Sequence, residues 1–418
     1  MSSERSEGMK AVAVVMVFFV AFVGITIHAV PVSPPRADDS GATPEGIRSV
    51  ANAISQFALE LYSNIRNGDG GNIFYSPYSI FVALAMAYEG ARGQTADEIR
   101  SVFHFPSDNA TLRSSMAAIY NELNREDGSD LLRTANALWV QNDYPLLEEY
   151  LSTIDRYYVG RAGNVDFRWA TEQARQTING WVQDETNNKI RDLLPPGSLD
   201  PSTRLFLTNA IYFEGAWVTQ FPVSETQEQD FRVSEGQTVR VPMMNLLGHY
   251  GAVFNYFEDE NLQVLEMKYD SGDLSMLILL PKNGNLTSLE DSLTLEHLNQ
   301  WRNGLTEQRV DVSIPRFTFT AEYSLARNLA EMGMPTAFSG AADFSGIDGT
   351  RNLCIQYVVH QAFIDVNEKG TEGAAATGVG MCLMLPPLFL ANHPFMFLIQ
   401  DRGTGNILFL GRVIDPTQ

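Results

Sequence analysis

The side chains best suited to chemistry are spread along the sequence without the spacing of a catalytic motif. The six histidines stand far apart, at positions 28, 104, 249, 297, 360 and 393, and none pairs at metal-ligand spacing. The sequence has no G-x-S-x-G, no H-E-x-x-H, no phosphate-binding P-loop and no C-x-x-C. Adjacent carboxylates such as Glu148 and Glu149 are unavoidable among 50 acidic residues and fit a solvated surface. We therefore expect no enzyme activity, no cofactor and no metal site.

Composition and charge exclude further classes of protein. Of the 418 residues, 44% are apolar and 19% are charged, a globular composition that excludes a wholly disordered chain. There are 29 Lys and Arg against 50 Asp and Glu, so the net charge of −21 repels nucleic acid and anionic membrane surfaces. Cys354 and Cys382 are the only cysteines, too few for a disulfide scaffold.

The first 46 residues divide into an apolar segment and a polar one. Residues 11–27 carry no charge, follow Lys10 and precede the small residue Ala29. This order is typical of an export signal, and the run is only slightly short for a bilayer span. We interpret residues 1–30 as a signal peptide or a retained signal anchor, with burial in the domain core as the remaining alternative. Residues 31–46 then form a polar, proline-rich tether, and the remaining chain is extracellular, either secreted or membrane-anchored through residues 11–30.

Hydrophobic periodicity divides the chain from residue 47 onward into early helices and later strands, without a linker. Helices are predicted over 47–66, 79–88, 112–125, 146–157 and 170–190, and another begins at Thr95, which has capping-box spacing to Glu98. Strands are predicted over 205–213, 274–280, 310–314, 316–320, 356–366, 395–399 and 407–413. Segregation of helices from strands favours a single α+β domain with antiparallel sheets.

Four long segments closely resemble signatures of the serpin family. They read NIFYSPYSIFVALAMAYEGARGQTADEIRSVFHF at 72–105, TRLFLTNAIYFEGAWVTQF at 203–221, VVHQAFIDVNEKGTEGAAATG at 358–378 and HPFMFLIQDRGTGNILFLGRVIDP at 393–416. Their order and spacing also match the family. The resemblance implies that residues 47–418 form a single serpin-like α+β domain, with eight or nine helices around three β-sheets and an exposed reactive loop near the C-terminus. It also implies a metastable protease inhibitor whose covalent partner is a target serine protease.

The resemblance places the hinge of the reactive loop at the start of the third segment. The resemblance implies that, after cleavage by a protease, the hinge would insert as a new strand into the main sheet, which would require small side chains. Because side chains alternate along a strand, if Thr371 faces inward then every second residue after it also faces inward, and Glu372 faces solvent. The hinge residues are Glu368, Gly370, Thr371, Gly373, Ala374, Ala375, Ala376 and Thr377.

Two ways of counting locate the bond that the protease would cleave. Counting seventeen residues from Glu368 gives Met384–Leu385, whereas counting back from Pro386 and Pro387 gives Leu383–Met384. Both bonds follow an apolar side chain, and no Lys or Arg occurs from Thr371 through Asp401. The expected targets are therefore chymotrypsin-, elastase- or subtilisin-like serine proteases, with cysteine proteases of apolar preference as a further possibility.

Five more residues match family positions around the main sheet. Ser76, Ser79, Asn209 and His360 match a polar cluster under the centre of the sheet. We interpret this central polar cluster as a hydrogen-bonded latch where strands part; core polar residues without a gating role are the alternative. Trp217 matches the aromatic residue at the end of the sheet where insertion begins, although core packing would also explain a lone tryptophan.

The sequence also bears on partners and on a rival function. Residues 112–125 carry only Arg113 and Arg125 against Glu122, so the basic stripe that binds heparin in some family members is missing. We expect a monomer that does not bind heparin. The alternative function is a non-inhibitory serpin-like carrier, storage protein or folding helper. Members of that kind often carry bulky, charged or proline residues in the hinge, and the small hinge here favours inhibition.

Overall fold

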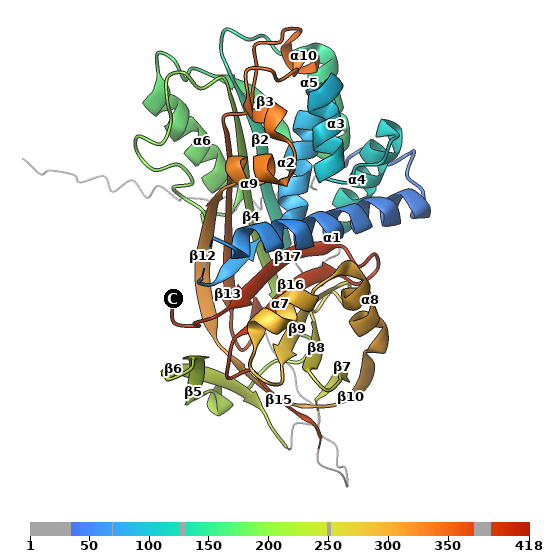
Figure 1. Cartoon of the computed structure of the whole chain (residues 1–418), viewed down its shortest axis with the longest axis vertical. Helices are drawn as coiled ribbons and strands as arrows, with labels where there is room; N and C mark the ends of the chain where they lie inside the picture. Colours follow the sequence, from blue (N-terminus) through green and yellow to red (C-terminus); the bar gives the residue numbers. More distant parts are fainter. Residues whose placement is uncertain (1–34, 69, 126–130, 249–251, 372–385) are drawn as a thin grey trace, which may run out of the picture. The chain divides into compact units, whose positions relative to one another are not determined.

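The structure is a computed structural model that describes residues 35–418 except 69, 126–130, 249–251 and 372–385. Within these residues, ten α-helices surround three β-sheets (Figure 1). The α-helices are α1 (Pro44–Arg66), α2 (Pro77–Gly90), α3 (Gly93–Val102), α4 (Asn109–Leu123), α5 (Glu148–Tyr158), α6 (Thr171–Glu185), α7 (Leu286–Ser292), α8 (Leu295–Gly304), α9 (Ala326–Met332) and α10 (Ser345–Asp348). Short 3₁₀ turns add η1 (Val223–Glu225) and η2 (Pro335–Phe338). The count of ten α-helices exceeds the eight or nine expected. The count includes very short helices such as α9 and α10, with seven and four residues.

The main sheet carries the candidate site. Its strand order is β12-β13-β4-β2-β3, with the short β14 paired to β4. The bounds are β12 (Phe317–Ser324), β13 (Tyr357–Val366), β4 (Leu205–Ala216), β2 (Leu131–Gln141), β3 (Arg161–Val165) and β14 (Gly370–Thr371).

Two further sheets complete the fold. A seven-stranded sheet has the order β1 (Ile73–Tyr75), β17 (Ile407–Val413), β16 (Phe395–Asp401), β9 (Leu274–Pro281), β8 (Leu262–Lys268), β7 (Val253–Glu258) and β10 (Thr306–Arg309). A four-stranded sheet has the order β15 (Leu388–Leu390), β11 (Asp311–Pro315), β6 (Gln237–Leu246) and β5 (Gln227–Ser234). Most neighbouring strands are antiparallel, as expected, but three pairs are parallel: β13–β4, β2–β3 and β11–β15. Long connections join the members of each parallel pair, so no hairpin forces them to be antiparallel.

The main hydrophobic core lies on one face of the main sheet. Every residue of α2 is buried, which explains why its sequence is apolar all round. Pro77 begins the helix, and the Ser76 hydroxyl accepts a hydrogen bond from the Ser79 amide. A second, smaller core lies on the opposite face, where α6 covers the sheet; it includes Trp139, Phe206, Ala210 and Val359 together with Ile178 of α6.

Several helices begin a few residues from the position predicted from the sequence, and α1 and α3 show why. Helix α1 begins at Pro44, capped by Thr43, rather than at residue 47. Before it, Ala37 is buried and exchanges two hydrogen bonds with the Asn121 side chain of α4, so the chain already packs on the domain there. The predicted capping box at Thr95 is wrong: α3 begins at Gly93, and Thr95 lies inside the helix, where its hydroxyl accepts from the Asp343 amide.

The structure also bears on membrane association. Among the described residues, no helix combines the length and apolar character needed to cross a bilayer. Residues 1–30, interpreted as a signal peptide or anchor, lie outside the described residues.

Candidate functional site

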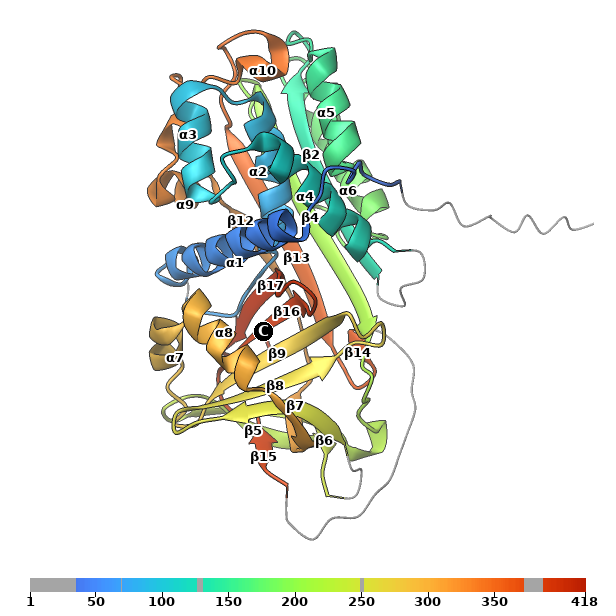
Figure 2. The ribbon, with the colours of Figure 1, turned by 90° about the vertical axis from the view of Figure 1, so that its right-hand side faces the viewer.

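The central feature of the main sheet is a seam between β13 and β4. These strands pair in parallel over six positions, from Tyr357–Phe206 to Ala362–Ile211. The pairing stops there, although both strands continue. Beyond this point β14 pairs with β4 instead, in antiparallel register, with Gly370 opposite Ala216 and Thr371 opposite Gly215 (Figure 2). The seam is therefore closed along one half of β4 and begins to accept a different partner at the other end.

The central polar cluster lies across the closed half of the seam, on the face covered by α2. All four predicted residues, Ser76, Ser79, Asn209 and His360, are fully buried. His360 and Asn209 are opposite each other in the β13–β4 register, and the imidazole Nδ1 bonds to the Asn209 side-chain oxygen. The Asn209 amide donates to Ser79 Oγ at 2.6 Å, and the Ser76 hydroxyl donates to the Leu408 carbonyl at 2.6 Å. The cluster thus joins both strands of the seam to α2 and β17.

The hydrogen bonds of His360 define its protonation state. Its Nε2 accepts from the Ser76 amide at 3.0 Å, so this nitrogen carries no proton. Nδ1 must therefore carry the single proton and donate it to Asn209. Burial disfavours the charged ring and lowers the pKa of His360 to about 3. The ring is neutral at physiological pH, and its two bonds link β13 to β4 and to the start of α2.

One member of the cluster was missed by the sequence analysis. The Asn136 side chain of β2 is buried, and its Oδ1 accepts from Asn209 Nδ2 at 2.6 Å and from Ser79 Oγ at 2.9 Å. The available signal was a single asparagine in a strand whose other described positions are largely apolar, because a buried amide needs polar partners.

The hinge begins in a tight turn at the far end of β13. Asn367 and Gly370 exchange two backbone hydrogen bonds of 3.0 and 3.2 Å. Gly370 has a φ of 145°, and a Cβ atom there would lie 2.2 Å from the Gly215 carbonyl oxygen and 2.7 Å from the Ala216 Cα. Only glycine allows this approach to β4.

Glu368 anchors this turn. Its side chain is only 4% exposed. Both carboxylate oxygens accept hydrogen bonds from Arg316 Nη2, and the bond to Oε1 is 2.5 Å long. Thr226 Oγ1 also donates to Oε1 at 2.7 Å, and the Phe221 amide donates to the Glu368 carbonyl. Burial raises the pKa of Glu368, but the hydrogen bonds from Arg316 and Thr226 outweigh it and leave the pKa below its usual value. The ionised carboxylate therefore fixes the point from which the loop departs. The sequence analysis placed Glu368 in the hinge but gave no partner for it.

Trp217 packs against the same turn. Its ring stacks on Tyr269 with centroids 4.5 Å apart, and its indole NH donates to the Asn367 carbonyl at 3.1 Å. The Trp217 amide also donates to the Lys369 carbonyl at 2.9 Å. The structure thus places Trp217 at the junction of β4 and the hinge turn, although core packing alone could also explain a buried tryptophan.

The structure describes only part of the predicted loop. Glu368 and Gly370 are described, and Thr371 is described through its backbone. The other hinge residues and both candidate cleavage bonds lie outside the described residues: Gly373, Ala374, Ala375, Ala376, Thr377, Leu383, Met384 and Leu385. Cys354 is half-buried and forms no disulfide within the part of the chain that the structure describes, and burial raises the pKa of its thiol.

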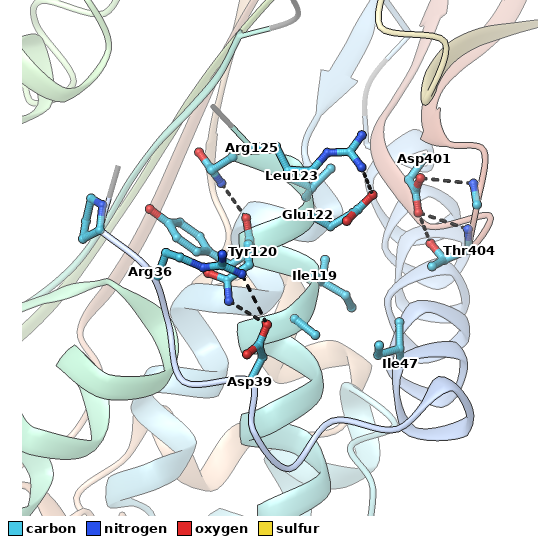
Figure 3. Close-up of a pocket in the computed structure, with 15 residues that line it drawn as sticks. Arg36, Asp39, Ile47, Ile119, Tyr120, Glu122, Leu123, Arg125, Asp401 and Thr404 are labelled. Atoms are coloured by element: carbon cyan, nitrogen blue, oxygen red, sulfur yellow. Dashed lines mark hydrogen bonds and ion pairs between the residues drawn. The ribbon is translucent and has the colours of Figure 1, made fainter. Parts of the chain in front are cut away.

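A cavity elsewhere on the domain is separate from the seam. It has a volume of about 700 Å³ and lies between α4, the start of α1 and the β16–β17 turn (Figure 3). Its ionic side chains pair with one another, Arg36 with Asp39 and Arg125 with Glu122. Within the described part of the chain, no three or more His, Cys, Asp or Glu side chains gather closely enough to hold a metal ion.

Comparison with known proteins identifies the family. The family model described as "Serpin (serine protease inhibitor)" matches residues 52–416. An uncharacterized serpin-like protein of Thermococcus kodakarensis is 43% identical, covering 88% of this chain and 86% of its own. Leukocyte elastase inhibitor A of Mus musculus is 41% identical, covering 88% and 100%. The crystal structure of uncleaved ovalbumin superposes with a TM-score of 0.80 at 33% identity, covering 88% and 100%. Together with the ten helices and three sheets, these matches show that the chain belongs to the serpin family.

Proposed function

We propose that this protein is an irreversible suicide-substrate inhibitor of serine proteases with apolar primary specificity. The observation that carries the proposal is the change of partner along β4. Its pairing with β13 ends at Ile211, and β14, the first piece of the hinge, already pairs with Ala216 and Gly215. A loop that continued in this direction would become a new strand between β13 and β4.

The energetics of insertion favour a one-use trap. A protease that attacks the loop forms an acyl-enzyme through its own nucleophile. Inserting about ten residues would add about ten strand hydrogen bonds, each contributing about 0.5–1.5 kcal/mol net. With the added side-chain burial, this release compares with the roughly 5–15 kcal/mol stability of a whole domain. That free energy is enough to drag the attached protease and distort its active site before the acyl-enzyme hydrolyses.

The seam supplies the resistance that such a trap needs before cleavage. Insertion has to break the six β13–β4 register positions and separate His360 from Asn209. Each buried polar group left without a partner would be penalised by about 1–3 kcal/mol. The central polar cluster therefore acts as the latch that keeps the uncleaved sheet closed, and Trp217 and Glu368 fix the end where entry begins.

Specificity and partners follow from the loop and the surface. The cleaved bond is Met384–Leu385, or Leu383–Met384 on the shorter count, which suits chymotrypsin-, elastase- or subtilisin-like enzymes. One relative is named for inhibition of leukocyte elastase, an observation that agrees with an apolar site. Arg113 of α4 pairs with Glu89, and Arg125, two residues after the helix, pairs with Glu122 and Asp273, which argues against heparin binding. The inhibitor acts as an extracellular monomer, secreted or anchored through residues 11–30.

One gel tests the mechanism. The protein is mixed with subtilisin or chymotrypsin, boiled in SDS and analysed for a band that contains both chains. We expect a covalent complex with at least one of these enzymes, and no complex with enzyme whose catalytic serine has been blocked beforehand. Clean cleavage of the loop without that band would support the non-inhibitory carrier, storage or folding-helper alternative.

A further inference from the structure

Lys189 lies over the seam at the place where β13 and β4 stop pairing. Its ammonium is 5.1 Å from the centroid of the Tyr212 ring on β4 and 5.9 Å from that of the Phe363 ring on β13. Both distances are within the range of a cation–π interaction. Tyr212 and Phe363 are the residues directly after Ile211 and Ala362, the last pair of the ladder. One cation therefore contacts both strands at the fork of the seam.

The turn that holds Lys189 is closely built. It follows α6 and contains two consecutive left-handed residues, Asn187 with φ 50° and Asn188 with φ 62°. The Lys189 amide donates to the Thr186 carbonyl at 2.9 Å, and the buried Thr186 hydroxyl donates to the Val182 carbonyl at 2.7 Å. Gln183 Nε2 also donates to Asn188 Oδ1 at 2.7 Å. The lysine is thus presented from a fixed backbone rather than from a loose connection.

Lys189 and the central polar cluster act on opposite faces of the sheet. Side chains alternate along a strand, so Tyr212 shares a face with Ala210, and Phe363 shares one with Val359. Ala210 and Val359 belong to the small core under α6. Asn209 and His360 belong to the other face, against α2. The seam is therefore bridged on one face by the His360–Asn209 hydrogen bond and on the other by Lys189.

We propose that Lys189, through the rings of Tyr212 and Phe363, is a positioning residue that holds the seam closed at its fork and sets the rate at which the loop inserts. The inference rests on the proposed function, because it concerns the step in which the sheet opens. An inserted strand would put two strand spacings, about 9.6 Å, between β13 and β4. The side chains of the inserted strand that face α6 would fill the space under the Lys189 ammonium. The contact of Lys189 with both rings therefore exists only before insertion.

The experiment opens the seam without any protease. An acetylated synthetic peptide of residues 371–384, carrying Cys382→Ser, is incubated with the full uncleaved protein, and the rate of annealing is followed on native gels. Urea midpoints are measured for the empty and the peptide-filled protein. For Lys189→Met, which keeps the apolar stem and removes the charge, we expect annealing about fivefold faster. We also expect a lower midpoint for the empty protein and an unchanged midpoint for the filled one.

Two variants serve as controls. Lys189→Arg keeps a cation over both rings and should anneal at nearly the parent rate. Lys282→Met removes a lysine whose ion pair is with Glu258, away from the seam, and should also behave as the parent. A general packing role for Lys189 would lower both midpoints equally.

Three outcomes would overturn the proposed role of Lys189. They are an equal lowering of both urea midpoints by Lys189→Met, no change in the annealing rate of Lys189→Met, or the same acceleration of annealing in Lys189→Arg. A parent protein that never takes up the peptide is a different failure. It would overturn the proposed insertion mechanism, and the role of Lys189 with it. This failure is recognised because the unmodified protein already shows no uptake of the peptide.

Discussion

His360 and Asn209 face each other across the β13–β4 seam, and a neutral imidazole donates its only ring proton to the asparagine side chain. They are 151 residues apart in the chain. The bond connects the two strands that insertion would separate, and it requires an uncharged ring, because the other nitrogen accepts from Ser76. The seam is therefore sensitive to anything that protonates His360.

This relationship predicts a pH dependence of stability. The pKa of His360 is about 3 in the folded protein, whereas an unfolded histidine titrates near 6.5. Between these values the unfolded state binds a proton that the folded state does not, so stability is complete above pH 6.5 and is lost as the pH falls towards 3. The loss should approach about 1.4 kcal/mol per pH unit. Urea midpoints from pH 7.5 to 5 measure it.

His360→Gln provides the comparison for that slope. The variant should be less stable than the parent at pH 7.5, because the two hydrogen bonds of the ring are disturbed. Its stability should nevertheless fall less steeply with decreasing pH, since the glutamine has no proton to gain. Parallel pH profiles for the two proteins would contradict the assignment of a buried neutral imidazole.

The Glu368–Arg316 pair predicts unequal effects for its two partners. Among the described residues, Arg316→Met leaves the buried carboxylate with Thr226 as its remaining side-chain donor, whereas Glu368→Gln removes the buried charge itself. We expect Arg316→Met to lower the urea stability of the uncleaved protein by about 1–2 kcal/mol, reduced by the 43% exposure of the arginine side chain. Glu368→Gln should lower it less. The reverse order would show that the carboxylate is not held by this arginine.

The hinge predicts a change from inhibitor to substrate. Position 371 pairs with Gly215. Gly215 is six residues from Asn209, so both positions lie on the face of β4 that is covered by α2. Thr371→Arg should place a charge on the face that insertion buries, at a penalty of several kcal/mol, so insertion slows while cleavage continues. The ratio of cleaved inhibitor to covalent complex on SDS gels should rise sharply. Glu372→Arg is the matched control, because the next residue should face solvent, and equal effects would reject this alternation.

The reactive bond predicts a change of target. Met384→Arg should turn the protein into an inhibitor of trypsin-like enzymes, whose acidic specificity pocket needs a basic side chain. N-terminal sequencing of the small C-terminal fragment then locates the cleaved bond in the parent. A new end at Leu385 supports Met384–Leu385, whereas a new end at Met384 supports the shorter count.

The left-handed backbone conformation of Val159 predicts that a substitution there stabilises the protein. Val159 follows α5 with φ 47° and ψ 32°, a left-handed conformation that is unfavourable for a β-branched residue by about 1–2 kcal/mol. Val159→Asn should raise the urea stability by about 1 kcal/mol, because asparagine tolerates this conformation. Val159→Ala removes only the branching and should gain less. No gain from asparagine would mean that packing of the valine side chain compensates for the backbone strain.

The sequence by itself determined the type and order of most elements. The all-apolar run at 79–88 encodes a helix buried on all sides, and the runs at 395–399 and 407–413 encode buried strands, because local periodicity reports which faces meet the core. It also identified the family positions of Ser76, Ser79, Asn209 and His360. It overextended α6 to residue 190, since the apolar spacing continues into a turn that two left-handed asparagines have already begun.

Only the tertiary structure decided which distant residues meet. Nothing local in the sequence pairs Glu368 with Arg316 or adds Asn136 to the central polar cluster, because these contacts form between strands brought together by the whole fold. The parallel β13–β4 ladder and its end at Ile211 have the same origin, and so does the position of Lys189 over two rings from different strands. Periodicity specifies which face of a strand is buried, whereas strand order and register depend on long-range packing that no short stretch of sequence contains.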